Sequence, residues 1–126
     1  MNYLLDTHVF LWMLSEPGRL NRKAVQAIHN PDHAVFVSAV SGVEIAIKAG
    51  LGKLEVPDGL ADEINSRGLQ ELPLTFRHGE ALAALPLHHA DPFDRMLLAQ
   101  ALEEDLVIIT HDAKMERYAG VKLLMT

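Results

Sequence analysis

Hydrophobic residues along the chain gather in short runs that are separated by longer amphipathic stretches. The clearest run is Leu106–Ile109 (LVII), and Asn2–Leu5 and Ala34–Val37 have the same character. Each is four residues long and rich in branched or aromatic side chains, which predicts a buried β-strand. Weaker runs at Leu69–Leu72 and Val121–Leu124 predict two further strands.

Helical spacing and helix-capping residues fill the segments between these runs. A residue that can cap a helix precedes several of them, and Asp91 is followed by Pro92, which is favoured at the first helical position. The predicted helices cover Thr7–Leu14, Asn21 (as cap) to about His29, Ser38 (as cap) to Gly50, Pro57 to Gly68, Thr75–Leu85, and Asp91 to about Glu104. Strands that alternate with helices predict an α/β fold, an α/β/α sandwich around a short parallel sheet. A chain of 126 residues fits one domain, residues 1–126.

Acidic residues occur where the predicted strands end. Asp6 ends the first strand, and Asp112 follows the LVII strand. Glu44 lies about two turns into the helix that leaves the second strand, and Asp94 lies in the first turn of the helix capped by Asp91. Because sites in parallel sheets form outside the carboxyl ends of the strands, we expect Asp6, Glu44, Asp94 and Asp112 to line one pocket.

Such a cluster of carboxylates needs a cation. Two carboxylates about 5 Å apart at an effective dielectric near 20 repel by roughly 3 kcal/mol. Mg²⁺ prefers carboxylate oxygens, so the four acids predict a divalent-metal site. Each residue alone also has a simpler interpretation: Asp6 as a helix cap, Asp94 as a first-turn acid favoured by the helix dipole, and Glu44 as a solvated helix residue. Asp91 is predicted to cap its helix rather than to bind metal.

Composition and charge narrow the class of protein. The chain has no cysteine, which excludes disulfides and cysteine zinc sites and suits a reducing cytoplasm. The net charge of −6 counts against a duplex-binding protein, although part of it belongs to the predicted metal site. Asp6 and His8 interrupt the N-terminal apolar run, so we expect neither a signal peptide nor a membrane segment.

Several other side chains near the acids have two open interpretations. His89 and His111 are expected either to contact substrate phosphate or to be surface residues. Lys48 and Arg95 are expected to pair with site acids, to guide RNA, or to be solvated. The apolar residues of the first helix are expected to form core, with an exposed part possible at a dimer face.

Two adjoining segments resemble a known family: HHADPFDRMLLAQAL (His88–Leu102) and LVIITHD (Leu106–Asp112). Together with LLDTHVFLW and VSAVSGVEIAIKAGLGKLEVP, they are similar to the PIN-domain nucleases, specifically the VapC-type toxins of bacterial toxin–antitoxin systems. The resemblance covers nearly the whole chain. It implies an endoribonuclease that hydrolyses RNA phosphodiester bonds with Mg²⁺ or Mn²⁺, a homodimer, and a small antitoxin protein over the active site. The family's catalytic and metal-binding acids fall on Asp6, Glu44, Asp94 and Asp112, with Thr7, Thr110 and Asp91 beside them.

Two alternatives stay open at this point. One is a housekeeping PIN-domain ribonuclease without an antitoxin, which the neighbouring gene would distinguish. The other is a non-nuclease acidic-pocket α/β module, of the receiver or phosphatase type. Such modules usually have a lysine near the end of a late strand, whereas this strand ends in Thr110-His111-Asp112. Metal-dependent RNA cleavage would separate them.

Overall fold

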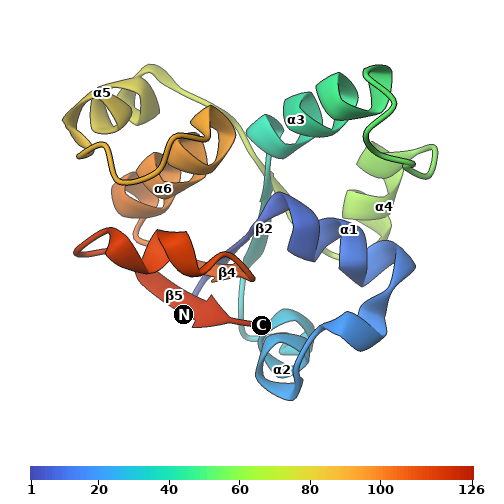
Figure 1. Ribbon diagram of the computed structural model, residues 1–126. Helices are drawn as coiled ribbons and strands as arrows, with labels where there is room; N and C mark the ends of the chain where they lie inside the picture. The colour runs from blue at the N-terminus through green and yellow to red at the C-terminus, as the bar shows by residue number, and fades with distance from the viewer.

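A five-stranded parallel sheet forms the centre of the computed structural model, which describes residues 1–126 (Figure 1). The strand order is β3-β2-β1-β4-β5, and every neighbouring pair is parallel. The strands are β1 (Tyr3–Leu5), β2 (Val35–Ser38), β3 (Gln70–Leu72), β4 (Val107–Thr110) and β5 (Lys122–Met125). The predicted α/β fold is therefore confirmed, and the two weaker apolar runs form the two edge strands.

Six α-helices and two 3₁₀ helices connect the strands. They are α1 (Thr7–Ser15), η1 (Pro17–Arg19), α2 (Arg22–His29), α3 (Ala39–Gly50), α4 (Leu60–Ser66), α5 (Phe76–Ala84), α6 (Pro92–Glu104) and η2 (Ala113–Arg117). The prediction that a helix begins at Pro57 is wrong, because Gly59 has a left-handed backbone with φ of 74° that separates this proline from α4. None of the helices is long and apolar enough to cross a membrane.

Alternation along the strands divides the core into two layers. Leu5 and Ile109 point to one face of the sheet, where they pack with residues of α1, α2 and α3. Leu4 and Ile108 point to the other face, where they pack with α6 and the η2 segment. In Figure 1 these layers appear as α1 and α2 on one side of the sheet and α5 and α6 on the other. Side chains of a strand alternate between faces, so each apolar run supplies both layers.

The chain leaves β1, β2 and β4 at one edge of the sheet, because all strands run in the same direction. Asp6 follows β1 directly and precedes α1. Ser38 ends β2, and its side chain accepts a hydrogen bond from the N–H of Val40, so that α3 begins at once. Asp112 follows β4 and caps η2 through the N–H of Lys114. The turns that carry the predicted acids therefore meet at this edge.

Candidate active site

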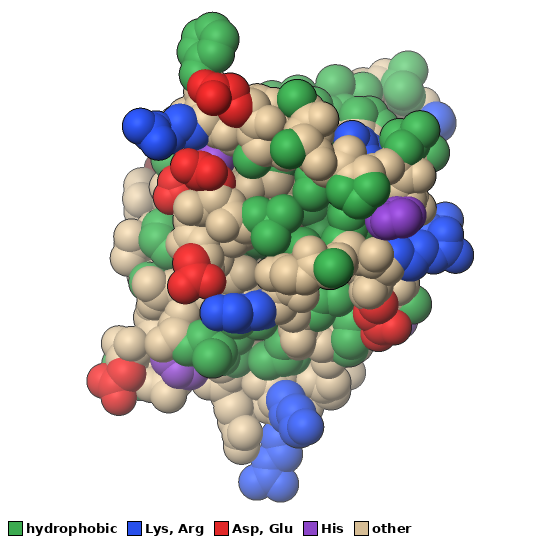
Figure 2. Space-filling view, turned by 90° about the vertical axis from the view of Figure 1, so that its left-hand side faces the viewer, with side chains coloured by type: hydrophobic (Ala, Val, Ile, Leu, Met, Phe, Trp, Pro, Cys, Tyr) green, Lys and Arg blue, Asp and Glu red, His purple; other side chains and the backbone are tan.

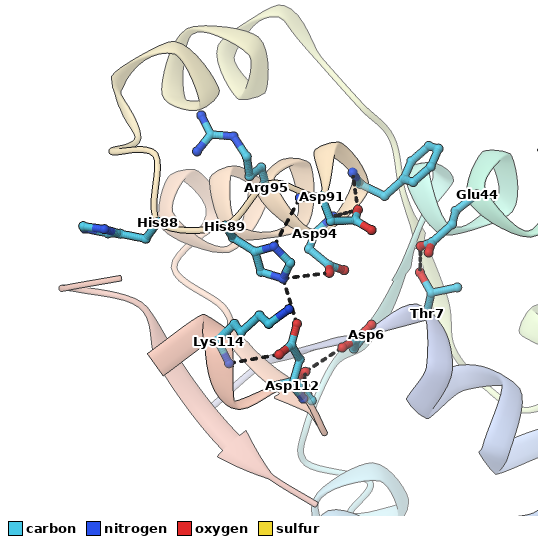
Figure 3. A network of polar contacts seen from close by, with 12 residues as sticks. Asp6, Thr7, Glu44, His88, His89, Asp91, Asp94, Arg95, Asp112 and Lys114 are labelled. Atoms are coloured by element: carbon cyan, nitrogen blue, oxygen red, sulfur yellow. Dashed lines mark hydrogen bonds and ion pairs between the residues drawn. The ribbon is translucent and has the colours of Figure 1, made fainter. Parts of the chain in front are cut away.

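A pocket of about 360 Å³ at the carboxyl edge of the sheet brings the four predicted acids together. Figure 3 shows Asp6, Asp94 and Asp112 facing one another, with Glu44 approaching from α3. The lining residues are Asp6, His8, Trp12, Glu44, Lys48, Asp91, Asp94, His111, Asp112 and Ala113. The predicted gathering of the acids is thus observed, across four separate segments of the chain.

Asp6 is held on the floor of this pocket by the neighbouring strand. Its backbone N–H donates to the carbonyl of Ile109 at 2.9 Å, and the hydroxyl of Thr110 donates to its carboxylate at 2.5 Å. Only 4% of Asp6 is exposed, and this burial raises the pKa of its carboxyl above the ordinary value, against the opposing effect of the Thr110 hydroxyl. Thr110 also accepts the N–H of Asp112 at 3.0 Å, so one hydroxyl orients two of the acids.

Glu44 is buried between α1 and α3, so its interpretation as a solvated helix residue is wrong. The hydroxyl of Thr7 donates to one carboxylate oxygen at 2.7 Å, and Lys48 Nζ donates to the other at 2.5 Å. Because Thr7 gives its proton to Glu44, Ser41 is the donor in the 2.8 Å contact between the Ser41 and Thr7 hydroxyls. The hydrogen bond to Glu44 raises the pKa of Lys48, which confirms Lys48 as an ion-pair partner of a site acid.

Asp94 enters the pocket from the first turn of α6. That helix begins as predicted, with Pro92 at its first position and the Asp91 side chain accepting the N–H groups of Phe93 and Asp94 at 2.9 and 3.1 Å. Burial, followed by the charges of Asp6, Asp91, Glu44 and Asp112, raises the pKa of Asp94 to about 8. Without a cation, Asp94 therefore keeps its proton at neutral pH.

His89 bridges Asp94 and Asp112. Its Nε2 lies 2.8 Å from Asp112 Oδ2 and 3.1 Å from Asp94 Oδ2 (Figure 3). The other ring nitrogen, Nδ1, accepts the backbone N–H of Asp91 at 3.2 Å, which assigns the proton of the neutral ring to Nε2. Burial raises the pKa of Asp112, but the hydrogen bonds from His89 and from the N–H of Lys114 outweigh it and leave that pKa below its usual range.

Of the two sequence interpretations of His89, the surface residue is wrong, and the contact with substrate phosphate stays a prediction. The residue is only 8% exposed, and its side chain holds the acids rather than facing solvent. Its place in the pocket depends on the buried Tyr118, whose hydroxyl accepts the N–H groups of His88 and His89 at 3.1 and 2.9 Å. A contact across 29 residues leaves no local signal in the sequence.

Arg95 does not pair with any site acid, so that prediction is wrong. Its guanidinium donates to the carbonyl of Pro86 at 2.9 Å and to the hydroxyl of Tyr118 at 3.2 Å. In Figure 3 it points away from the acids, on the far side of the His89 segment. Arg95 therefore supports the loop that positions His89. His111 lies at the pocket rim, where its Nδ1 donates to the carbonyl of Thr126 at 2.8 Å.

Two lining residues, His8 and Trp12, were not identified as site residues from the sequence. Both belong to α1, which begins one residue after Asp6. Residues four apart share a helix face, so a helix that starts at a site presents its first exposed face to that site. The four-residue spacing of His8 and Trp12 at the start of α1 could therefore have indicated that both side chains face the site.

The donor set of the pocket fits a hard divalent cation. It offers carboxylate oxygens, no cysteine, and a single buried imidazole whose Nε2 carries a proton. Ligand atoms of His89, Asp94 and Asp112 lie within 4.8 Å of one another. Burial first, and then the charges of the neighbouring acids, raise the pKa of Asp94 and disfavour its ionised form. A cation bound to these carboxylates would favour the ionised form instead.

Comparison with known proteins gives one family and one architecture. The sequence profile of the PIN domain matches residues 3–121. Ribonuclease VapC22 of Mycobacterium tuberculosis is 31% identical over 123 residues, which cover 91% of this chain and 90% of that protein. The fold is similar to VapBC2 from Rickettsia felis bound to a promoter DNA fragment (TM-score 0.70, 14% identity, 99% and 98% of the two chains). It is also similar to VapBC-1 from nontypeable Haemophilus influenzae (TM-score 0.68, 20% identity, 99% and 98%).

Proposed function

Since the chain belongs to the PIN-domain family, we propose that it is a Mg²⁺- or Mn²⁺-dependent endoribonuclease that hydrolyses RNA phosphodiester bonds. Residues 1–126 act in this proposal as a single nuclease domain, the toxin of a toxin–antitoxin pair in the cytoplasm. The observation that carries the proposal is the convergence of Asp6, Glu44, Asp94 and Asp112 in one pocket. The 31% identity to a protein named as a ribonuclease supports the same reaction.

The four carboxylates would hold the metal, and the surrounding side chains would keep them in place. The chemistry that Mg²⁺ or Mn²⁺ would supply there is activation of a water and stabilisation of the leaving oxygen at a phosphodiester. Thr110 orients the carboxylate of Asp6, and Thr7 orients that of Glu44. The Nε2–H of His89 holds the carboxylates of Asp94 and Asp112 toward each other. These donors prevent the acids from turning away while their mutual repulsion is unrelieved.

The charge distribution favours an RNA that reaches into the pocket over one that lies along a basic surface. The net charge is −6, and the face in Figure 2 carries acidic and basic side chains intermixed, with no continuous basic area. Proteins that track a nucleic-acid backbone usually carry such an area. A cation in the acidic pocket would supply local attraction for one phosphodiester, with Lys48 beside it.

We assign two protein partners to this nuclease. The first is a small antitoxin, as in the VapBC complexes whose fold is similar. A basic side chain of the antitoxin over the pocket would offset the acidic charge and exclude substrate. The test is purification with the product of the adjacent small gene. RNA cleavage should rise when that protein is removed, and unchanged cleavage would contradict this assignment.

The second partner is another copy of the chain. The apolar residues of α1 form core as expected, and Val9, Phe10 and Met13 are buried. An exposed apolar stripe lies instead on α3 and its C-cap, where Val43, Ile47 and Leu51 recur every four residues with 54%, 47% and 64% exposed. We expect a homodimer by sedimentation and a monomer for Ile47→Glu. A monomeric parent protein would contradict it.

The experiment that tests the nuclease is RNA cleavage by the purified protein with Mg²⁺, with Mn²⁺ and with EDTA. We expect cleavage only with metal, and a loss of several orders of magnitude in Asp94→Asn, because the metal would be misplaced. Asp62→Asn is the matched control, since Asp62 is also a first-turn helix acid but is exposed and does not line the pocket. Cleavage that survives EDTA, or that Asp94→Asn leaves intact, would refute the proposal.

A further inference from the structure

Three aromatic rings line the pocket beside the acids, and we call them the aromatic wall: His8, Trp12 and His111. The ring of Trp12 lies 6.3 Å from that of His8 and 5.2 Å from that of His111, measured between centroids. His111 meets Trp12 nearly at right angles, with 73° between the ring planes. His8 and His111 are exposed and Trp12 is partly exposed, so the wall is open to a ligand.

Two of the three rings, those of Trp12 and His111, are held in place before any ligand arrives. The guanidinium carbon of Arg19 lies 4.2 Å from the centroid of the Trp12 ring, and Arg19 is itself fixed by an ion pair with Glu16 at 3.3 Å. His111 is anchored by its hydrogen bond to the carbonyl of Thr126, whose own N–H donates to the carbonyl of Thr110 at 2.9 Å. Rings ordered in this way lose little further freedom when a ligand stacks on them.

Packing alone does not account for this arrangement. Trp12 does pack against the first core layer, as Leu11 and Leu14 do. A purely structural tryptophan, however, does not require two exposed imidazoles next to it on the same side of the pocket. Only two of the ten residues that line the pocket are hydrophobic, and Trp12 is the larger of them. It therefore presents the main apolar surface that a ligand of this site can reach.

We propose that the aromatic wall binds a nucleobase of single-stranded RNA, next to the phosphodiester held at the acids. The inference rests on the proposed nuclease function and adds its substrate class. A base is uncharged and flat, so it can approach this acidic pocket where a second phosphate would be repelled, and it stacks on aromatic rings with little dependence on sequence. A base paired within a helix does not expose its face, so the substrate is a loop, an end or a single strand.

Trp12 is the only tryptophan of the chain, so its fluorescence reports on the wall directly. The first experiment titrates the intact protein in Mg²⁺ with nucleoside 5′-monophosphates and, in parallel, with ribose 5-phosphate. We expect the nucleotides to quench Trp12 and to bind about fivefold or more tightly than the sugar phosphate, which has no base to stack. Equal affinity of the two probes, or no quenching by either, would overturn the proposal.

The second experiment measures KM and kcat for cleavage of a single-stranded RNA. Trp12→Leu should raise KM about fivefold or more with a smaller change in kcat, and Trp12→Phe should recover part of the loss, because phenylalanine keeps a stacking face. His8→Ala should also raise KM, and it changes an exposed side chain with no hydrogen bond, so folding is not at risk. An unchanged KM in Trp12→Leu and His8→Ala would refute the aromatic wall and leave the nuclease standing. A parent protein that cuts no RNA with metal would instead refute the proposed function.

Discussion

Two buried polar networks flank β2, and they differ in charge. The first, which we call the Gln100 network, joins Ser38, His78 and Gln100 between the sheet, α5 and α6. The hydroxyl of Ser38 donates to Gln100 Oε1 at 2.6 Å, and Gln100 Nε2 donates to the carbonyl of Pro73 at 3.2 Å. His78 Nδ1 accepts the N–H of Thr75 at 3.0 Å and completes the capping box of α5. Donors and acceptors alternate through this network. Its one charged member is Glu104, which is partly exposed and whose carboxylate lies 3.4 Å from His78 Nε2.

The second network is the acidic cluster of the pocket, and it consists mainly of acceptors. The hydroxyl of Thr110 donates to Asp6. Glu44 accepts from both Thr7 and Lys48. The Nε2–H of His89 is shared by Asp94 and Asp112. No buried side-chain oxygen or nitrogen in either network lacks a partner, so hydrogen bonding alone does not distinguish them. Charge does, because the acidic cluster keeps an excess that its own donors do not cancel. A polar network whose hydrogen bonds are satisfied and whose charge is balanced stabilises the fold. A network with excess negative charge destabilises the fold but can bind a cation.

The largest stability effect is expected from breaking the neutral network with Gln100→Leu. Leucine is similar in volume but removes the acceptor of the buried Ser38 hydroxyl and the amide that donates to His78 Nδ1 and to the Pro73 carbonyl. We expect the free energy of unfolding to fall by about 2 to 3 kcal/mol, measured by urea denaturation. The stabilisation that Mg²⁺ gives the protein should not change, because no pocket residue is touched.

Gln26→Leu is the control for that variant. Gln26 lies in α2 and is exposed, so its substitution should change stability by no more than about 0.5 kcal/mol. Equal stability of the Gln100 and Gln26 variants would show that the neutral network is not structural. The contrast between the two networks would then be lost.

A smaller loss is expected when the acidic cluster loses its shared donor in His89→Leu. Asp94 and Asp112 then face each other without the Nε2–H, and we expect a loss of about 1 to 2 kcal/mol in EDTA. Mg²⁺ should recover part of it, because a cation supplies the missing positive charge. His88→Leu is the control, since His88 is exposed and points away from the acids in Figure 3. A deficit of the same size in Mg²⁺ as in EDTA would make His89 a packing residue only.

Most of the fold could be predicted from the sequence because local chemistry specifies it. The strands are short apolar runs, and Asn21, Ser38, Thr75 and Asp91 each cap the helix that was expected to follow them. The wrong start at Pro57 has a local cause as well: the proline suited a first helical turn, but Gly59 adopts a left-handed backbone that a helix cannot contain. Glycine adopts either sign of φ, so the residue type alone does not show where the helix begins.

The acids of the site could be placed from the sequence, whereas the groups that hold them could not. Parallel strands deliver their carboxyl ends to one edge, so the topology alone brings Asp6 and Asp112 together. His89 reaches them only because Tyr118 fixes its backbone, and Arg95 binds that same tyrosine instead of an acid. The buried face of α3 could not be predicted either, because the helix buries Ser41 and Glu44 against α1 and turns the apolar Val43 and Ile47 outward. Which face of a helix is buried is decided by its neighbour when both faces are apolar.

The smallest effect, and the only gain, is expected for Asp94→Asn in EDTA. The variant keeps the shape of the side chain and leaves the Asp91 cap in place. It replaces an acid that must keep its proton in the folded pocket, although the unfolded chain releases that proton at neutral pH. We expect it to be more stable than the parent by about 1 kcal/mol near neutral pH, as is common when a functional site is relieved of its own repulsion. Asp62→Asn, in the first turn of α4, should show no such gain. With Mg²⁺ the parent should gain stability by mass action and the variant should gain less.

The pH dependence of the stability difference between Asp94→Asn and the parent tests the cause of that gain. Because the pKa of Asp94 is raised from 3.8 to about 8, the folded protein keeps a proton that the unfolded chain has already released. The stability that this group contributes is therefore fully present below about pH 4 and is lost as the pH rises toward 8. The difference between variant and parent in EDTA should accordingly be small near pH 5 and should widen toward pH 8, as measured by urea denaturation. If the variant is instead less stable than the parent across this range and still cuts RNA at the parent's rate, Asp94 is a structural helix-start acid. The excess charge that distinguishes the pocket from the Gln100 network would then have to be sought among Asp6, Glu44 and Asp112.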